Sequence, residues 1–417
     1  MLTNDLILNI FYYIATLVLI VKVFLLIINI RYISKNANTV PQKFSQKISL
    51  EEHQKAACYS QSRLKFKVVA TLYHFILLLA WLPFGGLEKL DQLTRGLGYS
   101  SDTASFIFFG IYLIISIVLS LPESIYSTFF IEAKYGFNKT TSRIFINDLI
   151  KQFLLTICLM FPVLYAIFAF IENFEHVWWI YSWICLVAFQ FLLMWAYPKI
   201  ISPLFNKFSP LDDEELTSKV QKLSSDTKIK FKDYYVMNAS LRSSHGNAYF
   251  TGFGKNKRIV FFDTLLNSLS SNEVVAVLAH ELGHLKEKHI LKSMVISTIS
   301  LGIGFYILYL SYNYTELYSS FSLEKSKHIA LLLFTFLIPQ ATFFLTPIMS
   351  WLSRRNEYSA DRFSVRHSSG NDLINALVKM YKDNSSSLTP SPIFSKFYNS
   401  HPPALERVEF IESISTN

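Results

Sequence analysis

The chain has 417 residues, of which 51% are hydrophobic and 16% aromatic, and it carries 39 Lys and Arg against 30 Asp and Glu. Its mean hydropathy is positive, which excludes an ordinary soluble domain and is typical of a protein that crosses the membrane several times. The positive surplus is spread between apolar segments rather than clustered. Membrane topology and anionic lipid explain it better than nucleic-acid binding, and we expect no nucleic-acid partner.

Seven apolar runs approach the roughly 20 residues that a membrane-spanning helix needs. They are residues 6–30, 67–86, 105–122, 150–171, 177–197, 290–312 and 329–351. The first run is too long for a signal-peptide core and follows the acidic stretch MLTND, so we expect it to stay in the protein. The sequence thus predicts four parts: a five-span membrane domain at 1–198, a cytoplasmic module at 199–289, two further spans at 290–351, and a cytoplasmic segment at 352–417.

The distribution of Lys and Arg predicts the orientation of the chain in the membrane. These residues are frequent in 31–67, in 199–288 and after Trp351, whereas the loop ENFEH at 172–176 has none. The positive-inside rule places the basic segments in the cytoplasm and the amino terminus outside. Cys58, Cys158 and Cys185 have no CxxC spacing, so they predict neither a disulfide framework nor a thiolate metal site.

The polar interval 199–289 has its own secondary-structure signals. SPLDDEELTSKVQKLSS predicts an amphipathic helix with an acidic first turn. DYYVMNAS, GNAYFTGF and KRIVFFDTLL predict short strands in a hairpin or meander. Ser270 and Glu273 then have the spacing of a capping box and predict the start of a helix. We therefore expect a small α+β module, and NDLINALVKMYKD predicts a further amphipathic helix near the carboxyl end.

The predicted helix after Ser270 contains HELGH, in which His280, Glu281 and His284 match the H-E-x-x-H pattern. Residues four apart differ by about 40° around a helix, so both imidazoles project from one face and can bind one Zn²⁺ ion. Glu281 then lies where it can act as the general base on a metal-bound water. The alternative, surface histidines on an amphipathic helix, is disfavoured by how rarely this pattern arises by chance.

The third metal ligand has to come from outside this helix. His289 follows His280 by nine residues, about 180° around a continuous helix, and is expected to face away from the metal. An extended metzincin motif would need Gly at position 287 and His at position 290, where the chain has Glu287 and Ile290. Glu316 and Glu324 lie between spans six and seven, on the opposite side of the membrane.

Glu357 lies just beyond span seven and returns to the correct side of the membrane. If RRNEYSADR is helical, Glu357 and Asp361 share a face, so Glu357 can ligate the metal while Asp361 orients a ligand imidazole. The alternative is a charged helix face that pairs with nearby arginines, and HELGH favours the metal interpretation. Two His and one Glu leave one position for water, as in catalytic zinc sites, which predicts hydrolysis of a peptide bond.

These motifs resemble the type I CAAX prenyl proteases, integral membrane zinc metalloproteases of the gluzincin kind. Beyond HELGH and NEYSAD, the resemblance rests on further segments that span nearly the whole chain. They are FIEAKYGFNKTT (130–141), YPKIISPLFNKFSPL (197–211), HGNAYFTGFGKNKRIVFFDTLL (245–266) and SHPPALERV (400–408). The resemblance implies a membrane all-α fold, with seven helices forming a barrel around an intramembrane chamber and the zinc near its cytoplasmic end.

The resemblance also implies roles for individual residues. His280, His284 and Glu357 match the family's zinc ligands, and Glu281 matches its catalytic base. Asn247 and Ala248 match edge-strand positions that hold the substrate backbone by β-augmentation. His401 and Arg407 match positions close to the zinc that stabilise the oxyanion. The alternatives are an ordinary strand edge for Asn247 and Ala248 and a turn residue for His401, which precedes two prolines.

Family members remove the last three residues of prenylated CAAX proteins, so the expected partners are such a substrate and membrane lipid. Two other hypotheses stay open. One is a bacterial-type quality-control protease with the same zinc chemistry and a substrate without a prenyl group, and the other is a non-catalytic membrane scaffold. The intact Glu281 argues against the scaffold. The expected location is the endoplasmic reticulum membrane for a eukaryotic protein or the inner membrane for a bacterial one, with the active site toward the cytoplasm.

Overall fold

The computed structural model describes residues 3–229, 231, 233–251 and 258–415. It has seven helices that are long and apolar enough to cross a membrane, which confirms the seven predicted runs at the level of length and composition. With their terminal turns these helices are Asn4–Asn36, Leu50–Trp81, Ser101–Glu132, Ser142–Asn173, Trp178–Phe205, His289–Tyr312 and Lys327–His367. Most extend well beyond the apolar run, so the long helices continue past the predicted membrane segments.

The second predicted span extends past the carboxyl end of its helix. Residues 67–86 were expected to form it, but α2 begins at Leu50, where Ser49 and Glu52 form a capping box, and ends at Trp81. The chain then turns at Gly85, which has a φ of 75°, a conformation that favours glycine. A side chain at Gly86 would meet the carbonyl oxygen of Ala80 at 2.6 Å. The turn and the close approach explain why the apolar run outlasts the helix.

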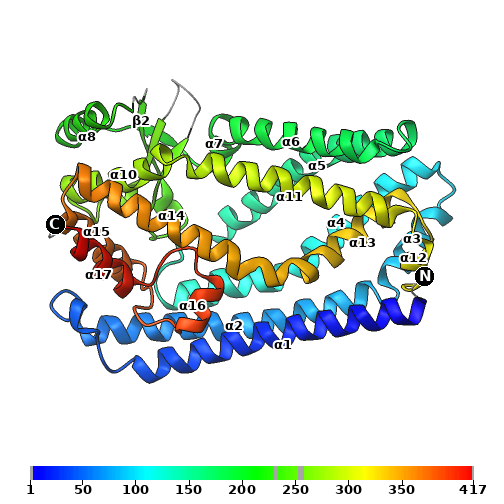
Figure 1. The fold of residues 1–417 in the computed structure, drawn as a ribbon, viewed down its shortest axis with the longest axis horizontal. Helices are drawn as coiled ribbons and strands as arrows, with labels where there is room; N and C mark the ends of the chain where they lie inside the picture. The colour runs from blue at the N-terminus through cyan, green and yellow to red at the C-terminus, as the bar shows by residue number, and fades with distance from the viewer. Residues whose placement is uncertain (1–2, 230, 232, 252–257, 416–417) are drawn as a thin grey trace.

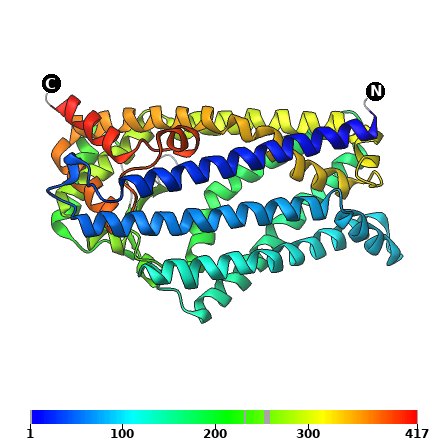
Figure 2. The ribbon, with the colours of Figure 1, turned by 90° about the horizontal axis from the view of Figure 1, so that it is seen from below.

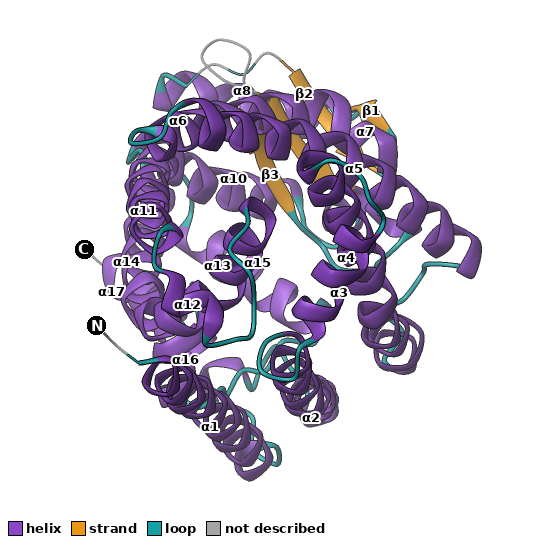
Figure 3. Cartoon of the chain, turned by 90° about the vertical axis from the view of Figure 1, so that its right-hand side faces the viewer, coloured by secondary structure: helices purple, strands orange, loops and turns teal. Residues whose placement is uncertain are grey.

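The long helices lie side by side along the longest axis of the molecule (Figure 1). Viewed along that axis they follow one another around a ring, which is the expected barrel (Figure 3). The elements, in chain order, are α1 (Asn4–Asn36), α2 (Leu50–Trp81), α3 (Gly86–Gly96), α4 (Ser101–Ile125), α5 (Ser142–Asn173), α6 (Trp178–Ala196), α7 (Ser202–Phe205), α8 (Glu214–Thr227), α9 (Asp263–Leu266), α10 (Ser271–Lys286), α11 (His289–Tyr312), α12 (Thr315–Ser319), α13 (Lys327–Thr342), α14 (Thr346–His367), α15 (Gly370–Asp383), α16 (Pro392–Tyr398) and α17 (Ala404–Ser415). Short 3₁₀ or π turns join several of them, including the π segment Tyr126–Glu132 that continues α4.

The outer faces of these helices expose large apolar side chains. Val69, Val118 and Ile299 are 60%, 57% and 55% exposed, respectively. In water such a surface would cause aggregation, whereas in a bilayer it faces acyl chains of similar polarity. The exposed apolar faces therefore fit an integral membrane protein.

The barrel end near the amino terminus is closed by side-chain packing. Phe11, Leu87, Phe108, Trp178 and Tyr318 belong to one apolar cluster that gathers residues from the helices at this end. Polar contacts add to it: His328 Nε2 lies 2.7 Å from Asp91 Oδ1 and its Nδ1 lies 2.8 Å from Ser105 Oγ. Lys327 pairs with Asp102 and Glu172. The two chain ends lie at opposite ends of the long axis, with the predicted α+β module beside the carboxyl terminus (Figure 2).

The module contains a four-stranded sheet in the order β1-β2-β4-β3. Its strands are β1 (Phe208–Pro210), β2 (Asp233–Met237), β3 (Ala248–Thr251) and β4 (Arg258–Phe262). The predicted hairpin is confirmed for β3 and β4, which pair antiparallel. The predicted meander is wrong, because β2 pairs in parallel with β4, which lies between β2 and β3 in the sheet. The last two residues of the predicted strand GNAYFTGF lie outside the described residues.

Other predictions for the module hold, with shifted boundaries. The amphipathic helix predicted near 209–225 is α8, which begins one residue after its cap Asp213 and leaves the preceding residues to β1. The capping box of Ser270 and Glu273 begins α10 as predicted. The apolar core of the module also includes Phe363 and Ala376, from the segment after span seven. The carboxyl-terminal helices are thus packed into the same body as the sheet.

Helices α10 and α14 approach so closely at Gly283 that no side chain fits between them. A Cβ at this position would lie 2.8 Å from the Cα of Ala360 and 3.0 Å from the Cβ of Phe363. Gly283→Ala should therefore force the two helices apart and lower the free energy of unfolding by about 1–3 kcal/mol. Thermal unfolding of the detergent-solubilised protein measures this change.

Gly304→Ala is the matched control, because its Cβ would meet the Phe334 ring at an ordinary 3.7 Å. It should leave the unfolding temperature unchanged or slightly raised, since Ala favours a helix more than Gly does. Equal unfolding temperatures for the two variants would contradict the close-packing argument.

Candidate metal centre

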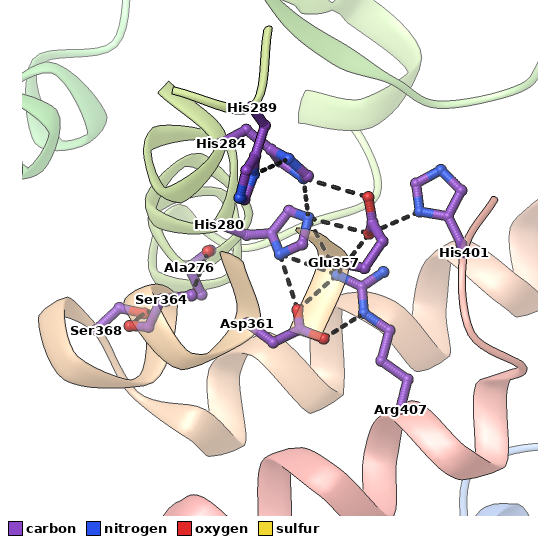
Figure 4. Close-up of polar contacts among 10 residues, drawn as sticks. All are labelled: Ala276, His280, His284, His289, Glu357, Asp361, Ser364, Ser368, His401 and Arg407. Carbon is purple, nitrogen blue, oxygen red and sulfur yellow. Dashed lines mark hydrogen bonds and ion pairs between the residues drawn. The ribbon is translucent and has the colours of Figure 1, made fainter. Parts of the chain in front are cut away.

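The HELGH histidines project from α10 toward α14. His280 Nε2 and His284 Nε2 lie 3.2 Å apart, as expected for residues one helical turn from each other. Glu357 on α14 faces both: its Oε2 lies 3.4 Å from His280 Nε2 and its Oε1 lies 3.2 Å from His284 Nε2 (Figure 4). One donor atom from each residue lies within 4.8 Å of the others. The three side chains are placed so that a single metal ion could be held among them.

The state of the Glu357 carboxylate fits a metal site. Glu357 is 4% exposed, and its buried Oε2 receives no hydrogen bond of normal geometry from the described residues. His401 Nδ1 is only 2.7 Å from this oxygen and Arg407 Nη2 is 3.8 Å away, but close approach alone does not satisfy an acceptor. A buried carboxylate oxygen without a donor is costly, and a cation bound beside it would remove that cost.

Asp361 supports His280 from the side opposite Glu357. Its Oδ1 lies 2.8 Å from His280 Nδ1, and Arg407 donates to both carboxylate oxygens from Nε at 2.8 Å and Nη2 at 2.7 Å. Burial alone would lower the pKa of Arg407, but the Asp361 carboxylate raises it above its ordinary value. Asp361 thus holds His280 Nδ1, which leaves Nε2 directed at the metal position.

Arg407 lies close to the metal position, as the resemblance implied: its shortest contacts are with Asp361, and its Nη2 also lies 3.2 Å from His280 Nε2. The side chain is 6% exposed and engages Asp361 in a bidentate pair. Nη2 also approaches His280 Nδ1 at 3.0 Å. This geometry suits the positioning of Asp361 and His280. His401, in contrast, is exposed at 62% of its side chain and lies in a cavity of about 340 Å³.

His289 is not among the three donors that lie together, but the continuous helix from which its direction was predicted is absent. Helix α10 ends at Lys286, and Lys288 has a φ of 57°, so the chain turns before α11 begins. His289 is therefore not on the extension of α10. Its ring packs against His284 with centroids 5.1 Å apart, and the two Nδ1 atoms lie 3.0 Å apart. No sequence signal marked this break, because Lys seldom adopts a positive φ.

Glu281 lies beside His284, and the predicted substrate-binding residues lie at the outermost strand of the sheet. Glu281 lines a cavity of about 470 Å³ together with His284, His289 and residues of α11 and α14. Ala248 begins β3, the outermost strand of the sheet, so one side of this strand pairs with no strand among the described residues. The carbonyl of the preceding Asn247 accepts from Phe262 N at 3.0 Å, which leaves the opposite edge available for a further strand.

Two family models together match most of the chain. Residues 29–207 match the CAAX prenyl protease N-terminal domain with five membrane helices, and residues 210–415 match peptidase family M48. CAAX prenyl protease 1 homologues from Oryza sativa subsp. japonica and Homo sapiens are 36% and 32% identical to it, covering 90% and 92% of this chain and 90% and 91% of theirs. The crystal structure of S. mikatae Ste24p is similar with a TM-score of 0.92 at 29% identity, covering 97% of this chain and 99% of that one.

These similarities bear on two of the open hypotheses. The relatives carry the name CAAX prenyl protease and come from eukaryotes, so they support the CAAX-type hypothesis over the bacterial quality-control alternative. The match to a peptidase family, with HELGH intact, likewise supports an enzyme over a scaffold.

The contact between His284 and His289 yields a prediction about metal affinity. When His284 binds a metal through Nε2, its Nδ1 carries the proton and donates to His289 Nδ1. His289→Leu removes that acceptor and should weaken Zn²⁺ affinity by about 10- to 100-fold, measured by competition with a chelator.

His289→Asn is the matched variant, because its Oδ1 can replace Nδ1 as the acceptor, and it should keep most of the affinity. If the Leu variant binds Zn²⁺ as tightly as the unmodified protein, His289 has no part in orienting His284.

Proposed function

Because the chain belongs to peptidase family M48, in the branch of the CAAX prenyl proteases, we propose that it is a membrane zinc endopeptidase that removes the last three residues of prenylated CAAX proteins. The observation that carries this proposal is the convergence of His280, His284 and Glu357 within 4.8 Å. Two His and one carboxylate leave a coordination position open, which is the composition of catalytic rather than structural zinc sites.

In this proposal His280, His284 and Glu357 hold one Zn²⁺ ion per chain. A zinc ion bound there supplies Lewis-acid polarisation of the scissile carbonyl and lowers the pKa of a water molecule. Glu281 accepts the proton of the attacking water and returns it to the leaving amine. Asp361 keeps His280 in the tautomer that presents Nε2, and Arg407 neutralises the buried Asp361.

The unpaired edge of β3 supports a role for Asn247 and Ala248 in substrate binding. A substrate that adds a strand to this edge would have its backbone held by main-chain hydrogen bonds. His401, exposed beside Glu357, can donate toward an oxygen that becomes negative in the transition state. The contacts of Arg407 with Asp361 favour an indirect contribution, through the position of His280.

Glu281→Gln should bind Zn²⁺ normally and fail to cleave, because it removes the general base and no metal ligand. Glu357→Ala should lose Zn²⁺, because it removes the third ligand. Elemental analysis of the purified proteins measures the metal, and cleavage of a farnesylated CAAX peptide measures activity. Cleavage by Glu281→Gln at the unmodified rate would contradict the mechanism, and unchanged Zn²⁺ affinity in Glu357→Ala would remove Glu357 from the ligand set.

The substrate proposal is tested separately from the chemistry. Rates for a farnesylated CAAX peptide are compared with those for its unprenylated counterpart and for an unfolded membrane protein. We expect the farnesylated peptide to be preferred, because the relatives are named as prenyl proteases. A preference for the unfolded protein would favour a quality-control protease with the same zinc site.

We further propose that the chain lies in the endoplasmic reticulum membrane with its active site toward the cytoplasm. The basic residues of 31–67 and 199–288 support this orientation. Cys58 is exposed on α2 within the first basic segment, whereas Cys158 and Cys185 lie within spans. A membrane-impermeant maleimide should label Cys58 from the cytoplasmic side of intact vesicles, and labelling from the luminal side alone would reverse the orientation.

A further inference from the structure

The barrel contains a cavity of about 580 Å³ between α1, α2, α4, α13 and α16. Its size is typical of sites for small ligands. The cavity lies among membrane-spanning helices rather than in the protease module, so the metal chemistry does not account for it. We refer to it as the barrel cavity.

The lining of the barrel cavity changes along the barrel axis. The metal centre lies toward one end of that axis and the amino terminus at the other, so later residues of α1 and α4 and earlier residues of α2 lie nearer the metal (Figure 1). The end nearer the metal centre carries Lys22, Lys67, Thr71, Ser120 and Gln340. The far end is lined by Val18, Phe75, Leu78, Trp81, Tyr112 and Phe336. The lysines therefore lie at the near end, which also carries the apolar Leu26 and Phe394, and the far end is mainly apolar, with His74 and Thr335 beside it.

The two lysines at the near end have no acidic partner. Neither forms an ion pair with any described residue, and Lys22 Nζ lies over the Phe343 ring, 5.2 Å from its centroid. Lys22 lies within the first span, where an ionisable group is costly and tends to mark a ligand site, whereas Lys67 is exposed at the start of the second predicted span. A cation–π contact compensates for only part of that cost. Two unpaired ammonium groups in one cavity favour an anionic ligand.

The barrel cavity adjoins the candidate metal centre. Tyr398 lines it and also lines the smaller cavity that contains His401. His401 Nδ1 in turn lies 2.7 Å from the metal-facing Oε2 of Glu357. A ligand in the barrel cavity therefore lies next to the cavity of His401, with Tyr398 on the wall of both.

We propose that the barrel cavity binds the isoprenoid chain of the substrate at its far end, with Lys22 and Lys67 facing the free carboxylate of the CAAX terminus. This inference rests on the proposed function and extends it to substrate recognition. In a prenylated CAAX terminus the carboxylate lies three residues beyond the modified Cys, at most about 10 Å away. One molecule thus carries a long apolar chain and an anion close together, which matches the two ends of the cavity.

The isoprenoid part is tested by filling the cavity. Ser116 lies on the cavity wall, and Ser116→Phe should raise KM for a farnesylated peptide by about tenfold or more through the loss of buried apolar contact. Its KM for the unprenylated peptide should stay unchanged. Val118→Phe is the matched control on the same helix, because Val118 points outward and is 57% exposed. An unchanged KM for the farnesylated peptide in Ser116→Phe would overturn the isoprenoid assignment.

The carboxylate part is tested by comparing the farnesylated free-acid peptide with its carboxamide. The unmodified protein should prefer the acid, and Lys22→Gln and Lys67→Gln should each reduce that preference severalfold. Lys65→Gln, on α2 with Lys67 but outside the cavity lining, should retain it. Equal preference in all three variants would remove the lysines from substrate recognition.

A direct measurement guards against variants that fail to fold. A photoreactive isoprenoid peptide bound to the unmodified protein should crosslink to α1, α2 or α4 residues of the barrel cavity. Crosslinks confined to outward positions such as Val69 and Val118 would show that the isoprenoid stays in lipid and would overturn the proposal. Failure of the proposed function looks different: the unmodified protein would then cleave none of these peptides, or cleave them without regard to the farnesyl group.

Discussion

The candidate metal centre depends on the packing of α10 against α14. Gly283 lets the two backbones approach until the place of its missing Cβ lies 2.8 Å from Ala360 Cα. This approach places Glu357 between His280 and His284, and it places Asp361, one turn further along α14, against His280 Nδ1. A wider separation would leave each helix with an incomplete set of ligands. The small residue within HELGH therefore has a geometric role in addition to the two histidines.

This packing buries charged groups. Asp361 is fully buried and Arg407 nearly so, and burying an ion pair commonly costs as much desolvation energy as its attraction returns. A hydrophobic pair of similar volume could stabilise the fold equally well. In the charged pair, the Asp361 carboxylate accepts a hydrogen bond from His280 Nδ1, which no apolar side chain could do. The buried pair is thus better explained by the orientation of a metal ligand than by stability.

Two membrane spans separate the ligands in sequence. Helices α11 and α13 lie between HELGH and Glu357, so the metal centre can assemble only when both spans are in place. At the opposite end of the barrel the same two spans contribute Phe305 and Ile329 to the apolar cluster that closes it. The protease module and the barrel are therefore joined through these spans at both ends, and neither is an independent appendage of the other.

The sequence predicted the parts of this protein that depend on local patterns. Seven spans, the capping box at Ser270 and the HELGH face each follow from periodicity or spacing within one segment, and Glu357 follows from counting membrane crossings. The strand order was not predictable, because β4 inserts between β2 and β3 through tertiary packing that no turn signal records. The contact of His289 with His284 was not predictable for a related reason, since a left-handed Lys288, which ends the helical path, has no sequence signature.

The change from polar to apolar side chains along the barrel interior matches two steps that need different surroundings. Hydrolysis needs water, charge and a fixed metal at one end of the barrel, whereas an isoprenoid chain needs an apolar surface, which a site exposed to water cannot supply. Because the polar end and the apolar surface lie along one axis, a single extended ligand can contact both. The lysines at the near end of the barrel cavity lie where the two environments meet, which is where a cation loses least solvation and can still attract a carboxylate. A membrane barrel with the metal at one end thus suits a substrate that is lipid at one residue and an ordinary peptide at the next.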